Sequence, residues 1–100
     1  MSVWTDEWDE AAQAEYVEAF EHYEAIDNAL ADALAAEVDR VVDLIVRSRQ
    51  VAAPYLFGTQ RKNLNKFPYA IVYRLIEDRE VVYIASFVHQ HRKPGYWRDH

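Results

Sequence analysis

The chain lacks cysteine and is poor in glycine and proline, with two glycines and three prolines among its 100 residues. Without cysteine, no disulfide can cross-link the fold and no thiolate can serve as a nucleophile or a soft metal ligand, so a reducing compartment suits the chain. No apolar run approaches the roughly 20 residues of a membrane-spanning helix, and six acidic side chains within the first twenty residues exclude a secretory signal segment. The sequence therefore predicts a cytoplasmic protein that makes no membrane contact.

Positive charge is scarce in the first half of the chain and dominates the second. Residues 1–50 carry thirteen acidic and three basic side chains, whereas residues 51–100 carry four acidic and eight basic ones. The net charge of −6 thus conceals a bipolar molecule, and any nucleic-acid contact is expected from the C-terminal half. Hydrophobic residues make up 51% of the chain, which is enough for one core, so we expect a single domain over residues 1–100.

Two amphipathic helices are predicted between residues 5 and 48. Thr5 or Asp6 can cap the first helix, and a second cap lies in the break at residues 25–28. Because this link is short, the helices should form an antiparallel hairpin, with only Val3 and Trp4 before it as a stub of strand. Apolar residues recur every three or four positions, at Trp8, Ala12, Tyr16, Ala19, Phe20 and Tyr23 and then at Leu30, Leu34, Val38, Val41, Val42 and Ile45.

Three antiparallel strands are predicted after the helices. Residues 59–64 form a polar strand whose Arg61 and Lys62 suit a sheet edge. Two apolar runs rich in β-branched and aromatic residues then flank a charged break at residues 77–80, which is the pattern of a hairpin. The expected fold is α+β: a short N-terminal strand and a two-helix hairpin packed on an antiparallel sheet, in the order β-α-α-β-β-β.

Alternation of side chains along the hairpin strands predicts which residues share a face. Tyr69, Ile71, Tyr73 and Leu75 should lie on one face of their strand, with Arg74 on the other. By the same count, His89 should continue the face of Val81, Tyr83, Ala85 and Phe87. The predicted core comprises Phe20, Tyr23, Leu34, Val38, Ile45, Ile71, Tyr73, Ile84 and Phe87.

His89 and His91 invite interpretation as a pair of metal ligands, since they lie two residues apart on a strand. No third ligand stands at a useful spacing, and cysteine is absent. We therefore expect a structural role for His89, no metal site and no cofactor.

A basic and aromatic cluster near the C-terminus is the best candidate for a working surface. Arginine and aromatic side chains anchor protein interfaces and also stack on unpaired bases. A structural alternative stays open, in which Trp97 closes the core and Arg74 pairs with an acid. The cluster comprises Arg74, Arg92, Lys93, Tyr96, Trp97 and Arg98.

The order and spacing of several motifs resemble the RelE/ParE superfamily of bacterial toxins, closest to its ParE-like branch. The C-terminal motifs are Phe67-Pro68-Tyr69, Tyr73-Arg74, His89, Arg92 and Pro94-Gly95-Tyr96-Trp97. In the helical segment, Ala12, Glu15, Ala19 and Tyr23 occupy the positions where the superfamily carries Ala, Glu, Ala and Tyr. The resemblance covers nearly the whole chain. It departs at the front, where the family has a longer first strand and residues 5–11 here are predicted to be helical.

The resemblance implies the toxin of a type II toxin–antitoxin pair, acting by binding a target, which is DNA gyrase for those ParE-like toxins whose target is identified. The target-binding surface would comprise Arg74, His89, Arg92, Lys93, Tyr96 and Trp97. A cognate antitoxin would bind the helical hairpin, or add a strand to a sheet edge, and form a hetero-oligomer. Its basic residues would lie opposite acidic ones, and its expected contacts are Glu15, Glu18, Tyr23, Leu34 and Asp39.

Two alternative functions remain open. RelE-like toxins cut messenger RNA on the ribosome, and Arg92 and Tyr96 match part of their catalytic set, with Arg61 as a phosphate contact. Tyr69, however, stands where those enzymes place a central arginine, which counts against ribonuclease chemistry. The second alternative is a relic that has lost toxicity and only binds an antitoxin.

Overall fold

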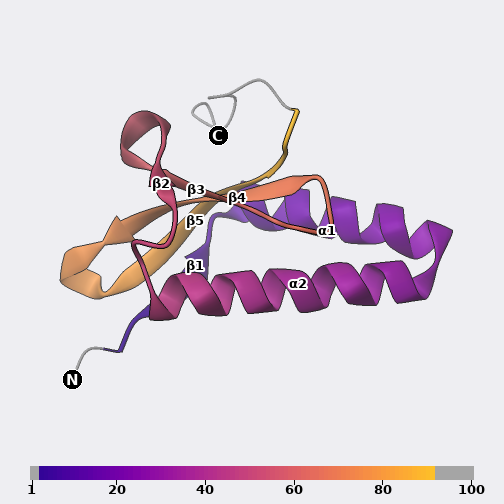
Figure 1. Cartoon of the computed structure of the whole chain (residues 1–100), viewed down its shortest axis with the longest axis horizontal. Coiled ribbons are helices and arrows are strands. Elements are labelled where there is room, and N and C mark those ends of the chain that lie inside the picture. The colour runs from indigo at the N-terminus through magenta and orange to yellow at the C-terminus, as the bar shows by residue number, and fades with distance from the viewer. Residues whose placement is uncertain (1–2, 92–100) are drawn as a thin grey trace.

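The computed structural model describes residues 3–91, which form two helices covering one face of a five-stranded sheet (Figure 1). The strand order in the sheet is β1-β5-β4-β3-β2. The α+β class and the helical hairpin are therefore confirmed. The helices are α1 (Glu10–Ile26) and α2 (Asn28–Arg47), and the strands are β1 (Thr5–Trp8), β2 (Ala53–Pro54), β3 (Gln60–Asn63), β4 (Tyr69–Ile76) and β5 (Val81–His89).

Two aspartates set the ends of the helices. The Asp9 side chain accepts a hydrogen bond from the Ala11 backbone N–H at the start of α1, at 2.9 Å. Asp27 ends α1 and caps α2, where its carboxylate accepts from the Ala29 N–H at 2.9 Å. A carboxylate at these positions satisfies an orphan N–H and lies at the positive end of the helix dipole. A single residue between the helices forces the chain to reverse, which produces the predicted hairpin.

The front of the chain differs from the prediction. Residues 5–8 are not the start of α1, because they form β1, which pairs in parallel with β5. The Thr5 N–H donates to the Glu80 carbonyl at 3.1 Å, and the Asp9 N–H donates to the Ile84 carbonyl at 2.9 Å. The strand is favoured over a longer helix because it satisfies the free edge of β5 and lets Trp4 and Trp8 pack against the core. The sheet is thus mixed rather than wholly antiparallel.

The opposite edge of the sheet also differs from the prediction. The strand bearing Arg61 and Lys62 was expected at the edge, but the two-residue strand β2 pairs with β3 from outside. The other prediction for this region, antiparallel pairing of β3, β4 and β5, is confirmed. The short β2 leaves little backbone free at this edge, which limits unwanted strand pairing.

The core lies between the helices and the sheet, much as predicted. Tyr73 on β4 is 0% exposed, and its hydroxyl donates to the Arg49 carbonyl at 3.1 Å. Phe20 and Tyr23 are half-buried at the border of the core rather than inside it. The other predicted core residues are buried: Leu34, Val38, Ile45, Ile71, Ile84 and Phe87.

A β-bulge in β5 changes which residues face the helices. Val72 pairs with Ser86 and the next residue, Tyr73, pairs with Ile84, so Ala85 is the extra residue in β5. Beyond the bulge, Phe87 therefore joins Ile84 in the main core. The prediction that His89 shares a face with Val81, Tyr83 and Ala85 is wrong, because the bulge inverts the alternation.

Two glutamates from the helices hold irregular parts of the sheet. Glu15 of α1 accepts from the Ser86 hydroxyl at 3.1 Å and the Phe87 N–H at 3.3 Å, and so provides an acceptor for two hydrogen-bond donors next to the bulge. Glu37 of α2 is 4% exposed and accepts from the backbone N–H groups of Asn65 and Lys66, at 2.8 and 3.1 Å. The buried Glu37 carboxylate requires these partners, since an unpaired buried charge is strongly unfavourable. In the part of the chain described, no helix is long and apolar enough to cross a bilayer.

Candidate functional site

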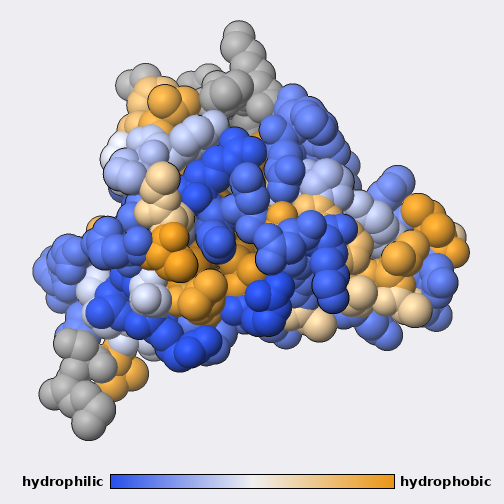
Figure 2. All heavy atoms as spheres, in the orientation of Figure 1, coloured by the Kyte–Doolittle hydropathy of each residue, from blue (hydrophilic) through white to orange (hydrophobic). Residues whose placement is uncertain are grey.

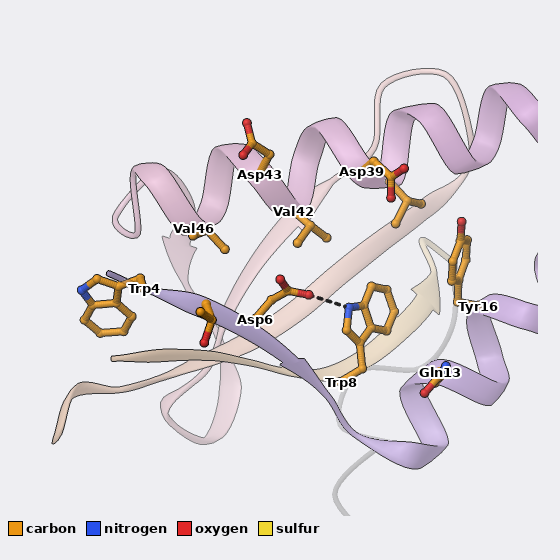
Figure 3. A pocket seen from close by; sticks show the side chains of 11 residues that line it. Trp4, Asp6, Trp8, Gln13, Tyr16, Asp39, Val42, Asp43 and Val46 are labelled. Carbon is orange, nitrogen blue, oxygen red and sulfur yellow. Dashed lines mark hydrogen bonds between the residues drawn. The ribbon is translucent and has the colours of Figure 1, made fainter. Parts of the chain in front are cut away.

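A groove of about 640 Å³ runs between β1 and α2 (Figure 3). Its apolar lining comes from Trp4, Trp8, Tyr16, Val42 and Val46. Trp8 and Tyr16 also contact each other, with ring centroids 5.5 Å apart. In Figure 2, hydrophobic atoms ringed by hydrophilic ones mark the region where β1 runs beside α2. An apolar recess of this kind suits a partner side chain.

Three aspartates give the groove its negative charge: Asp6 of β1 and Asp39 and Asp43 of α2. Asp6 accepts from the Trp8 indole N–H at 3.2 Å, which holds the indole along the groove (Figure 3). Asp43 forms an exposed ion pair with Arg47 at 2.9 Å, while Asp39 is exposed on the next turn. The groove thus combines apolar walls with an acidic rim, an arrangement complementary to a basic and apolar peptide.

One wall of this groove is a free strand edge. Thr5 and Asp9 direct their N–H groups toward β5. Because backbone groups alternate in direction along a strand, the N–H and C=O groups of Asp6 and Trp8 point away from β5. Among the described residues no further strand pairs with β1. A sheet edge of this kind can receive a strand from another chain.

The expected antitoxin contacts do not come together in one place. Asp39 lines the groove, but Glu18 and Tyr23 lie elsewhere on α1, where Tyr23 packs on Phe67 with ring centroids 5.0 Å apart. Leu34 is 0% exposed, so its prediction as a contact is wrong: the side chain serves the core. Glu15 is turned toward β5, where it holds the bulge.

A second hollow of about 280 Å³ lies between α1 and the end of β5. His89 contributes to it beside Tyr69, which meets the imidazole edge-on at 5.3 Å between ring centroids. Tyr69 also stacks on Phe87 at 5.0 Å. The remaining lining residues are Glu15, Glu18, Ala19 and His22. Within residues 3–91 no group of three or more His, Cys, Asp or Glu side chains is placed to hold a metal ion.

Arg74 lies on the face of the sheet away from the helices, far from His89. Its guanidinium stands 5.2 Å from the centre of the Tyr83 ring, an attractive cation–π arrangement. The Tyr83 hydroxyl in turn donates to the Asp9 carboxylate at 2.5 Å. Arg74 pairs with Tyr83 of β5, whereas His89 pairs with Tyr69 at the start of β4, and the two side chains lie on opposite faces of the sheet. Arg74 and His89 therefore do not lie together on the predicted target-binding surface.

Arg61 also lies on the face of the sheet away from the helices, where its side chain donates three hydrogen bonds. It donates to the Tyr55 hydroxyl at 3.1 Å, to the Asn63 side chain at 3.2 Å and to the Gln90 carbonyl at 3.5 Å. The other predicted target-binding or catalytic residues lie outside the described residues: Arg92, Lys93, Tyr96 and Trp97. The sequence did not identify Trp4, Trp8 and Asp43 as site residues, although two tryptophans within five positions in an acidic segment were an available signal.

Loss of stability at high pH is expected from four tyrosines. A hydrogen bond to Asp9 raises the pKa of Tyr83, and burial raises the pKa of Tyr16, Tyr69 and Tyr73. A raised folded-state pKa means that the contribution to stability is fully present below the ordinary value of 10.0 and is lost as pH rises through the folded-state values. Melting temperature measured with tyrosine absorbance should fall above pH 10 together with phenolate formation. A Tm that stays constant to pH 12 would contradict this.

A two-helix hairpin on one face of a mixed sheet, with a groove beside the free strand β1, describes the fold and the candidate site, and comparison with known proteins identifies the family. The model of the family described as "ParE toxin of type II toxin-antitoxin system, parDE" matches residues 7–94. The chain belongs to this family of ParE toxins. A solved structure described as the chromosomal ParDE TA system from P. aeruginosa has a similar fold, with a TM-score of 0.72 and 14% identity over 87% of this chain and 96% of that one. The search of curated proteins found no match.

Proposed function

We propose that this type II toxin is neutralised by a cognate antitoxin that lays a basic, extended segment along the groove between β1 and α2. The observation that carries this proposal is the combination of a free strand edge with an apolar, acidic-rimmed recess. The antitoxin backbone would pair with Asp6 and Trp8, as in other cases of strand addition. Its alternate side chains would enter between Trp8 and Val42, and its Arg or Lys residues would meet Asp39 and Asp43.

The proposed target is DNA gyrase, which the toxin would bind in the cytoplasm without catalysis of its own. Support comes from membership of the ParE family and from the basic character of the chain beyond residue 50. The face of the sheet opposite the helices carries Arg61 and Arg74 beside the aromatic rings of Tyr55 and Tyr83, and arginine with tyrosine is the composition of interface anchors. Glu18 and His89, at the second hollow, remain predicted contacts.

Co-expression tests the two halves of this proposal. The small open reading frame beside the gene is expressed with the tagged chain, and its product should co-purify. Induction of the chain alone should filament cells and raise an SOS response, and the purified chain should inhibit supercoiling by gyrase. An arrest of translation without an SOS response would contradict the gyrase target. Co-purification without any toxicity would favour the antitoxin-binding relic.

No ribonuclease activity is expected, with or without ribosomes. Tyr69 occupies the position of the central arginine in RelE-like enzymes, and its ring is half-buried against Phe87, so no cation stands there to stabilise a phosphorane. Primer extension on total messenger RNA after induction measures this. Reproducible cuts within codons, abolished by Arg92→Ala or Tyr96→Phe, would support the RelE-type alternative instead.

A further inference from the structure

The hollow between α1 and the end of β5 has the composition of a site for one basic side chain. Its aromatic lining comes from Tyr69 and Phe87, whose rings stack at 5.0 Å between centroids. Glu18 and His22, which are both exposed, add a carboxylate and an imidazole. Its volume of about 280 Å³ is below the range of about 300–1,000 Å³ that is usual for small-molecule pockets. The hollow therefore suits a single side chain of a protein partner.

The carboxylate of Glu18 is available to such a partner. Within residues 3–91 it forms no hydrogen bond and no ion pair, whereas the Glu15 carboxylate is occupied by the donors next to the bulge. Burial raises the pKa of Tyr69, and the nearby Tyr23 and Glu18 raise it further, so the Glu18 charge lies close to the Tyr69 side chain. A carboxylate beside an aromatic ring binds a guanidinium both by ion pairing and by stacking.

His89 adds a hydrogen-bond donor to the same hollow. Its Nδ1 accepts from the His91 backbone N–H at 3.2 Å, so the proton of the neutral ring lies on Nε2. A protonated Nε2 donates to a carbonyl oxygen and does not accept from a guanidinium. The hollow thus combines an acceptor for a cation, at Glu18, with a donor for the peptide backbone that carries the cation.

Helix α1 separates this hollow from the groove between β1 and α2. Tyr16 lines the groove, whereas Glu15 and Glu18 line the hollow. At 3.6 residues per turn, these side chains lie on two flanks of the helix, with Ala14 and Val17 on the exposed side between them. Val17 is 46% exposed there, and so offers an apolar contact to a chain that crosses. Because a helix is about 10–12 Å across, about five or six extended residues are enough to pass over it.

We propose that the hollow is a second anchor site for the antitoxin, whose groove-bound segment crosses α1 at Val17 and places one arginine against Glu18 and Tyr69. This inference rests on the proposed function and names a further contact of the same partner. Charge favours the antitoxin over the target as the occupant. The half of the chain that supplies both helices holds thirteen acidic and three basic side chains, so one basic partner suits the groove and the hollow alike.

The substitution Glu18→Gln tests this inference. It changes an exposed side chain to its neutral isostere, so the melting temperature should stay within about 2 °C of the wild-type value. Affinity for the co-purifying antitoxin, measured by titration calorimetry, should fall at least about tenfold, mainly through faster dissociation. The matched control is Glu24→Gln, which removes the same charge from an exposed position of α1 outside the hollow. This control should keep its affinity within about twofold, and an equal loss in both variants would overturn the inference.

The arginine itself is identified by replacing each arginine and lysine of the antitoxin with glutamine in turn. One arginine should couple to Glu18: its loss should weaken binding to the wild-type chain at least about tenfold, but binding to the Glu18→Gln variant less than about twofold. Lysine at that antitoxin position should bind about fivefold more weakly than arginine, because an ammonium lacks the planar fork that pairs and stacks. Coupling of Glu18 to a lysine, or to no basic residue, would overturn the inference.

The remaining outcomes separate this inference from the broader proposal. Wild-type affinity of Glu18→Gln, with weakened binding when Asp39 and Asp43 are reversed in charge, would support the groove and overturn only the second anchor. Reduced inhibition of gyrase by Glu18→Gln, with antitoxin affinity unchanged, would assign the hollow to the target and overturn the inference. An antitoxin that does not co-purify with the wild-type chain would overturn the proposed function itself.

Discussion

Tyr73→Ala is expected to lower the free energy of unfolding by about 3–5 kcal/mol, as truncation of a buried aromatic side chain does. Tyr73 is 0% exposed in the middle of β4, where its ring packs between the helices and the sheet. Its hydroxyl bonds the Arg49 carbonyl at 3.1 Å, just beyond the end of α2. The variant therefore loses both packing and a link between the segment that follows α2 and the sheet. Urea denaturation followed by circular dichroism measures the change.

Tyr73→Phe is the matched control for this substitution. It keeps the ring and removes only the hydroxyl, so the loss should be about 0.5–1.5 kcal/mol, the usual net value of one hydrogen bond. Comparison of the two variants separates the cavity from the polar contact. A loss below about 1 kcal/mol for Tyr73→Ala would show that β4 is not the centre of the core.

Local periodicity was sufficient for the helices and the central strands. The stripe through Leu34, Val38 and Ile45 predicts α2 because a helix turns once every 3.6 residues, and these three side chains are all buried. Alternation along β4 likewise placed Ile71 and Tyr73 on the helix side. These signals depend only on neighbours in the sequence, and so they are readable without a structure.

Pairing between segments that are distant in the sequence could not be predicted from local periodicity. Residues 5–8 have the acidic, capping composition of a helix start, but the open edge of β5 offers them backbone hydrogen bonds that are more than seventy residues away in sequence. The bulge at Ala85 similarly depends on the Glu15 carboxylate reaching Ser86 and Phe87. Neither contact produces a periodic pattern in the sequence. The parallel pairing of β1, and the change in which β5 residues face the helices beyond the bulge, were therefore not predicted.

The same limit explains the outcome for the candidate sites. Asp39 was named from its charge on a helix, and the structure places it in the groove. Trp4 and Trp8 join it there only because β1 lies beside α2, a consequence of the parallel pairing. Arg74 and His89 were grouped because both lie on the C-terminal hairpin. The bulge places their side chains on opposite faces of the sheet, and the length of the strands keeps them apart along the hairpin.

Reversal of charge at the groove is expected to have the largest effect on the antitoxin complex. In the double variant Asp39→Lys with Asp43→Lys, two cations would replace the acidic rim of the groove, where we propose that a basic antitoxin segment binds. Like charges placed together at an interface cost several kcal/mol, so affinity should fall about 100-fold or more, which corresponds to about 2.7 kcal/mol. The ion pair between Asp43 and Arg47 is exposed on both sides, so its loss should change fold stability by less than about 1 kcal/mol. Titration calorimetry with the co-purifying antitoxin measures the affinity.

The double variant Glu21→Lys with Glu24→Lys is the matched control, since it makes the same change in net charge on the exposed side of α1. If the groove binds the segment directly, only the groove variant loses affinity strongly, while both variants slow association at low salt through the field of the whole molecule. The difference in association rate should shrink as ionic strength rises, because exposed charges are screened beyond about 8–10 Å under physiological conditions. An equal loss of affinity in the two variants would mean that net charge, and not the groove between β1 and α2, attracts the antitoxin.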